Sequence, residues 1–212
     1  MSNDRNALAI ERYRKHAAGY DASAQRTEPL RRRTIEKLAL RAGDIVLDVG
    51  CGTGLSFELL EQAIGPRGKL IGIEQSPEMM AIARARVTER GWANVTLIEA
   101  PAESAALPAP ISALLFNFVH DVLQSPPAMS RIFAAAAPGA RVACQGMKLF
   151  PWWAAPVNLW VLAKARPYMT TFRNLSHPWT AFAPYVSKLE RETTMLGMGY
   201  VVWGNANPNL SS

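Results

Sequence analysis

The chain has 212 residues, enough for one domain with a sizeable core, and its 49% content of hydrophobic residues argues against a disordered protein. Its 23 Lys and Arg residues outnumber its 17 Asp and Glu residues, which gives a net charge of +6. Such a balance can serve contact with anionic lipid, nucleic acid or an acidic substrate, although a solvated helix face is the commoner meaning of a basic patch.

Cysteine content and apolar segments bear on the compartment. The two cysteines, Cys51 and Cys144, provide no disulfide framework, so we expect a reducing environment. The N-terminus is polar and charged and lacks the apolar core of a signal peptide, which predicts a cytoplasmic protein. The longest apolar tract, 149–163, is too short to span a bilayer and contains two prolines. Peripheral contact with an anionic membrane stays open, because basic helices and a Trp-rich tract both suit a lipid surface.

Two helices are expected before the first strand. Residues 6–19 have helical character. The second helix, marked by Ile35 and Leu38, has Pro29 near its start and Gly43 after its end.

The first strand is expected to lead into a glycine-rich loop, in the stretch Val46-Leu47-Asp48-Val49-Gly50-Cys51-Gly52-Thr53-Gly54. Glycine adopts φ > 0 and lacks a Cβ, so a ligand can lie directly against this backbone. A helix opening near Leu55 would point its free N–H groups at that ligand. A dinucleotide site needs G-x-G-x-x-G, whereas this loop reads G-x-G-x-G. The carboxylate of Asp48 would repel a pyrophosphate and attract a cationic amino group.

A second apolar run, 69–73, ends at Glu74, twenty residues after Gly54. Doubly wound folds keep at this place the acidic residue that binds ribose hydroxyls. Together with Asp48, Glu74 predicts a site for a nucleoside that carries no phosphates.

The remaining elements follow from breakers, caps and apolar runs. In chain order they are the helix that opens near Leu55, with its apolar face at Phe57, Leu59, Leu60 and Ile64, a helix from Ser76 to about Arg90, a strand at 95–99, a strand at 111–118, a helix from Pro126, a strand at 141–146, and closing strands at 189–196 and 200–204. The run at 111–118 is almost wholly apolar, as expected of a central parallel strand buried on both faces.

Over residues 40–146 these features resemble the class I S-adenosylmethionine-dependent methyltransferases. In that family the signature L-D-V-G-C-G-T-G, present here from Leu47 to Gly54, wraps the methionine part of the cofactor, and an acid at the position of Glu74 binds the ribose. The resemblance implies an α/β fold, with a doubly wound, mostly parallel seven-stranded sheet whose last strand is antiparallel. We expect a single domain, made of an N-terminal helical cap at 1–42, a cofactor-binding core at 43–148 and a substrate-side segment with the closing strands at 149–212.

The cofactor implied by the resemblance is S-adenosyl-L-methionine. Its candidate contacts lie in the cap, in the glycine loop and at the ends of neighbouring strands: Tyr20, Asp48, Gly50, Cys51, Gly52, Gly54, Glu74, Gln75, Ala102 and Asn117. Pro101 departs from the family, which has at this place the Asp that accepts a hydrogen bond from the adenine amino group. Proline offers neither a carboxylate nor an N–H, so we expect one adenine contact fewer, or a contact supplied from elsewhere.

Methyl transfer requires alignment and, for a protonated nucleophile, a base. His120 follows the strand end that faces the predicted cofactor, and the pKa of an imidazole suits proton abstraction near neutrality, so His120 is the candidate catalytic residue. The alternative is that His120 only shapes the pocket. A dyad with Asp121 is not expected, because adjacent helical side chains point apart. No metal site is expected, because the histidines lack paired-ligand spacing.

Aromatic side chains crowd the segment from Phe150 to Tyr185, for which we expect a lid over the methyl group. Its candidate substrate contacts are Trp152, Tyr168 and His177. Aromatic walls with few charges select an apolar or flat acceptor, which predicts methylation of a hydrophobic small molecule such as an aromatic or quinone-like metabolite.

Alternatives to that substrate class stay open. The resemblance covers phospholipid headgroup N-methyltransferases acting at the membrane surface as well as ubiquinone/menaquinone-type enzymes, because both share this core. A non-catalytic S-adenosylmethionine-binding partner or regulator is supported by Pro101 alone. Nucleic acid is not expected as a partner.

Overall fold

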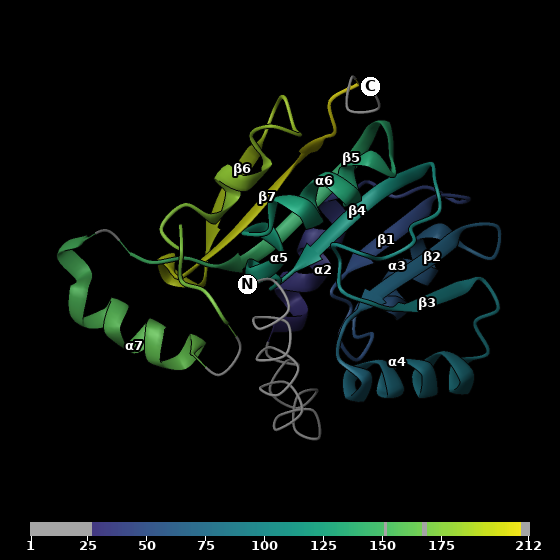
Figure 1. Cartoon of the computed structure of the whole chain (residues 1–212), viewed down its shortest axis with the longest axis horizontal. Helices are drawn as coiled ribbons and strands as arrows, with labels where there is room; N and C mark the ends of the chain where they lie inside the picture. The colour runs from purple at the N-terminus through teal and green to yellow at the C-terminus, as the bar shows by residue number, and fades with distance from the viewer. Residues whose placement is uncertain (1–26, 151, 167–168, 209–212) are drawn as a thin grey trace.

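The computed structural model describes residues 27–150, 152–166 and 169–208, which form a sheet with helices on both faces (Figure 1). The strands are β1 Ile45–Val49, β2 Lys69–Glu74, β3 Val95–Glu99, β4 Ile111–Asn117, β5 Ala136–Met147, β6 Glu190–Thr194 and β7 Gly199–Asn205. The α-helices are α2 Glu28–Lys37, α3 Phe57–Ile64, α4 Pro77–Arg90, α5 His120–Leu123, α6 Pro126–Ala134 and α7 Ala155–Ala165. Short 3-10 helices are η2 Trp152–Ala154, η3 Pro178–Phe182 and η4 Met195–Gly197.

The strand order of the seven-stranded sheet is β3-β2-β1-β4-β5-β7-β6. Strands β1 to β5 are parallel to their neighbours, and β7 is inserted antiparallel between β5 and β6. This arrangement confirms the predicted doubly wound sheet with an antiparallel last strand. The chain leaves β1 towards β2 and β3, then returns to build the other half from β4, so the carboxyl ends of β1 and β4 form the switch point where ligands bind in such sheets.

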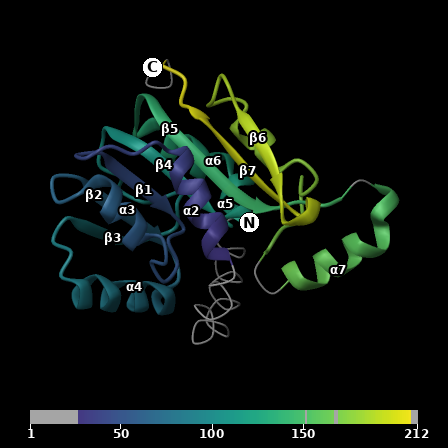
Figure 2. The same cartoon turned by 180° about the vertical axis from the view of Figure 1, so that it is seen from behind.

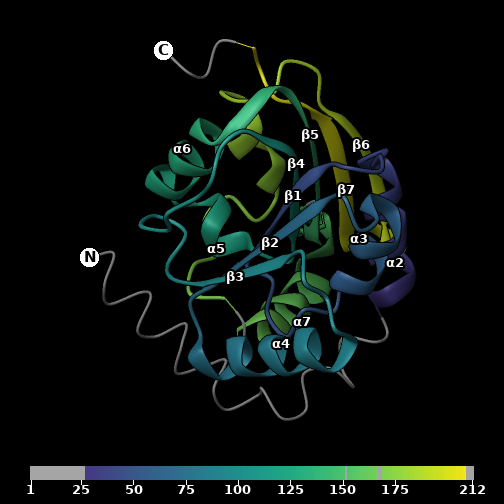
Figure 3. The same ribbon diagram turned by 90° about the vertical axis from the view of Figure 1, so that its right-hand side faces the viewer.

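The two faces of the sheet bury separate sets of apolar side chains. Leu114 and Phe116 of β4 face the side covered by α5 and α6, whereas Ala113 and Leu115 face the side covered by α2 and α3 (Figures 2 and 3). All four side chains are fully buried. The near-continuous apolar run of β4 is therefore explained by burial on both faces, as the sequence predicts.

Caps and turns set the helix bounds. At the start of α4 the Ser76 hydroxyl accepts a hydrogen bond from the Met79 N–H at 3.4 Å, and Pro77 occupies the first helical position, which confirms the predicted start. The helix expected near Leu55 begins at Phe57 instead. Tight turns delay it, because the Gly54 N–H bonds to the Cys51 carbonyl and the Phe57 N–H bonds to the Gly54 carbonyl.

Strand β5 begins five residues earlier than predicted, at Ala136 rather than Arg141. Its pairing with β4 jumps from Ile111↔Ala136 to Ala113↔Arg141, so residues 137–140 form a bulge within the strand. The closing strands β6 and β7 lie where the sequence places them.

The N-terminal cap is described only from residue 27 onward. Helix α2 matches the predicted second helix, whereas the helix expected at 6–19 lies outside the described residues. Among the helices that the structure describes, none combines the length and the apolar character needed to cross a bilayer.

Candidate active site

The glycine loop after β1 adopts backbone conformations that side chains disfavour. Gly50, Gly52 and Gly54 have φ values of +62°, +57° and +78°. A Cβ on Gly50 would come within 2.5 Å of Cγ1 of Val119, which follows β4. The glycines therefore let the loop turn back tightly against the end of β4, as the motif predicts.

Glu74, at the end of β2, is fixed by two backbone donors. Its Oε2 accepts a hydrogen bond from the Gly52 N–H at 3.1 Å, and its Oε1 accepts one from the Ser76 N–H at 2.8 Å. Burial raises the pKa of Glu74, and these two hydrogen bonds oppose the rise. Each carboxylate oxygen has a second lone pair, so Glu74 can still accept hydrogen bonds from a ligand.

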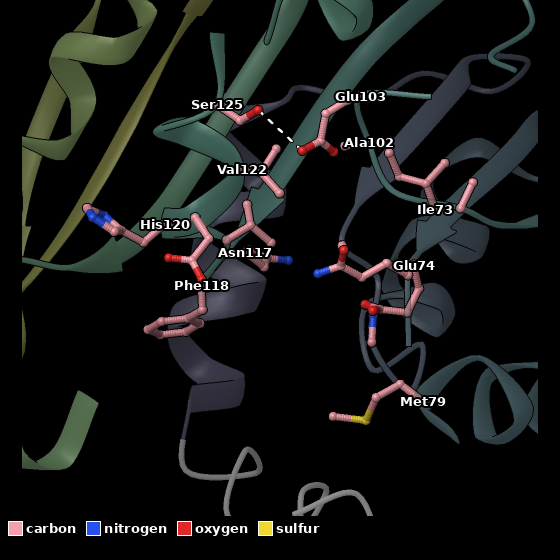
Figure 4. Close-up of a pocket in the computed structure, with 16 residues that line it drawn as sticks. Ile73, Glu74, Met79, Ala102, Glu103, Asn117, Phe118, His120, Val122 and Ser125 are labelled. Atoms are coloured by element: carbon pink, nitrogen blue, oxygen red, sulfur yellow. Dashed lines mark hydrogen bonds between the residues drawn. The ribbon is translucent and has the colours of Figure 1, made fainter. Parts of the chain in front are cut away.

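A cleft opens at the switch point between Glu74 on one side and the segment that follows β4 on the other (Figure 4). Its walls consist of Gly50, Gly52, Ile73, Glu74, Gln75, Met79, Ala100, Ala102, Glu103, Asn117, Phe118, Val119, His120, Asp121, Val122 and Ser125. The structure thus brings together seven predicted site residues, Gly50, Gly52, Glu74, Gln75, Ala102, Asn117 and His120. Cys51, Gly54 and Asp48 belong to the same motif but are not among the lining residues.

Asp48 belongs to β1, two residues before Gly50. Its side chain lies on the sheet face covered by α2 and α3 and is only 1% exposed. Neither of its carboxylate oxygens has a hydrogen-bond partner among the described residues. Burial raises the pKa of Asp48 to about 7, an effect that the positive charge of Arg31 on α2 partly opposes. A buried acid with spare acceptor capacity suits a cationic ligand group, as the sequence predicts for a cofactor with an amino group.

Asn117 is the last residue of β4, and its side chain also has an unused hydrogen-bond acceptor. Its Nδ2 donates to the Ser56 hydroxyl at 2.9 Å, whereas its Oδ1 is buried and has no partner in the described part of the chain. Asn117 and Asp48 therefore both have hydrogen-bond acceptors near the glycine loop that no described residue uses.

His120 begins α5, at the edge of the cleft opposite Glu74 (Figure 4). Its Nε2 lies 2.9 Å from the Arg173 carbonyl oxygen, which can only accept, so Nε2 carries the proton and Nδ1 is the basic nitrogen. Nδ1 is buried without a partner among the described residues. Burial lowers the pKa of His120, against the opposing effects of this hydrogen bond and of Asp121.

Asp121 does not pair with His120 but holds the same distant segment. Its Oδ2 accepts from both the N–H and the hydroxyl of Thr170, each at 2.7 Å, and its Oδ1 accepts from the Thr171 N–H at 3.2 Å. The two neighbours therefore fasten residues 170–173 to the cleft rim, a connection that no local sequence signal reveals.

Glu103 is a cleft residue that the sequence reasoning did not assign. It lies two residues after Pro101, and its Oε1 is only weakly bonded to the Ser125 hydroxyl, at 3.5 Å (Figure 4). Pro101 itself does not line the cleft, and its carbonyl accepts hydrogen bonds from the N–H groups of Ser104 and Ala105. The sequence could have indicated Glu103, because it lies only two residues after the position at which the family has its adenine-binding Asp.

The remaining predicted contacts are Tyr20 for the cofactor and Trp152, Tyr168 and His177 for the substrate. Tyr20, Tyr168 and the side chain of Trp152 lie outside the part of the chain that the structure describes. His177 is exposed and packs edge-on against Trp179, with ring centroids 5.5 Å apart, and it does not line the cleft.

Comparison with known proteins agrees with this geometry. Residues 46–139 match a family model described as a methyltransferase domain. A demethylmenaquinone methyltransferase of Symbiobacterium thermophilum is 28% identical over 220 residues, which cover 90% of this chain and 85% of that protein. The demethylmenaquinone methyltransferase of Anoxybacillus flavithermus is 30% identical over 118 residues, which cover 54% of this chain and 49% of the relative. The alignments span about half the length of several such relatives.

Solved structures share the fold. A SAM-dependent methyltransferase from Aquifex aeolicus aligns with a TM-score of 0.58 at 19% identity, over 82% of this chain and 88% of that chain. The chain therefore contains a methyltransferase domain, at residues 46–139, on the fold of the class I S-adenosylmethionine-dependent methyltransferases. Phosphoethanolamine N-methyltransferase 2 of Haemonchus contortus, solved with phosphomonomethylethanolamine and S-adenosylhomocysteine, aligns with a TM-score of 0.70 at 13% identity, over 95% of this chain and 59% of that chain.

S-adenosylmethionine is the cofactor of this methyltransferase family, and the cleft fits it on the protein's own geometry. Gly50 and Gly52 line the cleft with backbone conformations that side chains disfavour, and Glu74 offers acceptors for ribose hydroxyls. Asp48 does not itself line the cleft, but it is a buried acid next to the loop whose oxygens have no hydrogen-bond partner among the described residues. We propose these three features as the main cofactor contacts of this methyltransferase.

We predict that Glu74→Ala weakens S-adenosylmethionine binding about 10- to 100-fold, because a carboxylate hydrogen bond contributes roughly 1.5 to 3 kcal/mol. Isothermal titration calorimetry measures the effect. The matched control is Glu89→Ala on the exposed part of α4, which should bind as the wild type does. Unchanged affinity in a folded Glu74→Ala protein would remove Glu74 from the site.

We predict that Glu103 replaces the missing acid at Pro101. Glu103→Ala should weaken S-adenosylhomocysteine binding about tenfold, and adding Pro101→Asp to that variant should restore most of the loss. The loss should vanish for an analogue whose adenine amino group is replaced by hydrogen, because that ligand has no donor at this edge of the ring. Equal affinities of wild type and Glu103→Ala for S-adenosylhomocysteine would contradict the assignment.

Proposed function

We propose that this protein transfers the methyl group of S-adenosylmethionine to a hydrophobic small molecule of the aromatic or quinone-like class. The observation that carries the proposal is the alignment with a demethylmenaquinone methyltransferase along 90% of the chain. The cleft is consistent with such an acceptor, because Phe118, Val119 and Val122 give it an apolar wall beside His120 (Figure 4).

The chemistry asked of the protein is alignment. Bound S-adenosylmethionine supplies a methyl group on a sulfonium, which is already an electrophile. The glycine loop and Glu74 hold the nucleoside in one place, and the apolar wall holds the acceptor against it and excludes water. An acceptor hydroxyl must also lose a proton as its oxygen forms the new bond to carbon.

His120 is the group that we propose for that proton. Its Nε2–H is bonded to the Arg173 carbonyl, so Nδ1 is unprotonated and basic. Because burial lowers the pKa of His120, the imidazole is neutral and able to accept a proton at neutral pH. If His120 is the base, the acceptor hydroxyl binds on the side of the cleft away from Glu74.

The direct test is a screen for transfer of labelled methyl to phenols, quinols, amines and phosphatidylethanolamine. We expect transfer to quinols or phenols, and loss of that transfer in Glu74→Ala with Glu89→Ala as the matched control. Transfer only to amines or phosphatidylethanolamine would instead support the headgroup alternative. Binding of S-adenosylmethionine without transfer to any acceptor would support a regulatory protein.

We predict that His120→Ala lowers kcat about 100-fold and leaves the affinity for S-adenosylmethionine nearly unchanged. In the wild type, kcat should fall as the pH drops through a value below the ordinary 6.5 of histidine, because the neutral form is the active one. His120→Ala should lose this dependence.

Two controls separate a base from a positioning residue. Asp121→Asn loosens the same segment, 170–173, but keeps the imidazole, so it should retain the pH dependence. His177→Ala changes an exposed histidine and should leave kcat unchanged. A loss of kcat in Asp121→Asn as large as in His120→Ala would mean that His120 acts by holding the segment.

A further inference from the structure

Helix α7 stands away from the sheet (Figures 1 and 2). It and the residues just before it expose large apolar side chains to solvent. Trp153 just before the helix is 69% exposed, and within the helix Leu159 is 70%, Trp160 53% and Val157 44% exposed. Monomeric soluble proteins rarely leave so many large apolar residues together on one surface, so this face calls for an occupant.

The exposed face of α7 has almost no polar character. The helix reads APVNLWVLAKA, in which Lys164 is the only charged residue. Of the large apolar residues described in α7, only Val161 is fully buried. Leu162 is half-buried and packs against Met169 and Leu175. The helix therefore packs against the rest of the protein along a narrow strip, and its wider, Trp-containing face is exposed to solvent.

In the stretch of sequence that contains α7, all Lys, Arg, Asp and Glu positions are basic. From residue 122 to residue 189 the sequence contains seven Lys and Arg residues and no Asp or Glu, so this third of the chain accounts for the whole positive balance. In sequence, Lys148 precedes the helix, and Arg166 and Arg173 follow it; the two arginines are exposed. An apolar face framed by basic residues is complementary to a bilayer that carries anionic headgroups.

The helix is also fastened to the cleft. Asn158 forms two hydrogen bonds with the backbone of Phe150, at 2.8 and 3.0 Å, which fix α7 to the chain that leaves β5. After the helix, residues 170–173 are held by Asp121 and His120, which both line the cleft. A surface bound by α7 would therefore lie at a defined distance from the cleft.

We propose that α7 is a docking element for an anionic lipid bilayer, with Trp153 and Leu159 entering the interface and Arg166 and Arg173 meeting the headgroups. Docking places the cleft beside the phase in which a hydrophobic acceptor is dissolved. The proposal concerns binding alone, so it holds or fails independently of methyl transfer.

Flotation with vesicles tests the proposal on the full chain without cofactor or acceptor. The wild type should float with vesicles of phosphatidylcholine and phosphatidylglycerol and should float much less with phosphatidylcholine alone. Trp153→Ser/Leu159→Ser should lower the partition coefficient at least tenfold, with unchanged Tm because both side chains are exposed. A wild type that stays unbound with phosphatidylglycerol vesicles, or a double variant that floats as well as the wild type, would overturn it.

A matched pair of charge variants tests the electrostatic part. Arg166→Glu/Arg173→Glu and Arg67→Glu/Lys69→Glu change the net charge equally, but the second pair lies on exposed positions around β2. Only the first should lose binding, by at least tenfold, since each basic residue near a charged bilayer contributes about fivefold in affinity. Equal losses of binding in the two double variants would mean that binding depends on net charge and not on the position of the arginines. A wild-type dimer in light scattering that Trp153→Ser/Leu159→Ser makes monomeric would assign the face to a second copy and overturn the lipid proposal.

Discussion

The carboxylate of Glu74 connects the elements on which the site depends. Its two backbone hydrogen bonds, to Gly52 and Ser76, join the glycine loop after β1 to the start of α4 after β2. The backbone adds one more connection at this end, because the Cys51 N–H donates to the Ile73 carbonyl at 2.9 Å. A buried carboxylate is costly unless it is hydrogen-bonded, so Glu74 both closes the end of the sheet and stays ready to accept from a ligand.

Around this point the protein leaves several buried polar atoms unpaired among its described residues. They include both carboxylate oxygens of Asp48, Oδ1 of Asn117 and Nε2 of Gln145, whose other amide atom accepts from the Thr34 hydroxyl. An unpaired buried polar group costs about 1 to 3 kcal/mol, so a ligand that pairs with these groups gains binding free energy. Such atoms are not confined to the switch point, because Oγ1 of Thr194 in β6 also has no partner among the described residues.

Local patterns in the sequence were sufficient for the sheet and for half of the site. The glycine loop, Glu74 and the start of α4 at Ser76 are each encoded within a few residues, and all three were predicted. The partners of His120 and Asp121 could not be, because they come from a segment about fifty residues later. The aromatic segment shows the same limit. Its composition predicted a lid. No described residue of the segment lines the cleft, and Trp153 and Trp160 are exposed to solvent, since composition does not encode the direction in which a helix faces.

The account's central claim is that the switch-point cleft binds the nucleoside of S-adenosylmethionine through Glu74. A crystal structure with S-adenosylhomocysteine measures this most directly. The account predicts both ribose hydroxyls within hydrogen-bonding distance of the Glu74 carboxylate and the adenine ring beside Ala102 and Glu103. A nucleoside bound elsewhere, or a ribose turned away from Glu74, would contradict it.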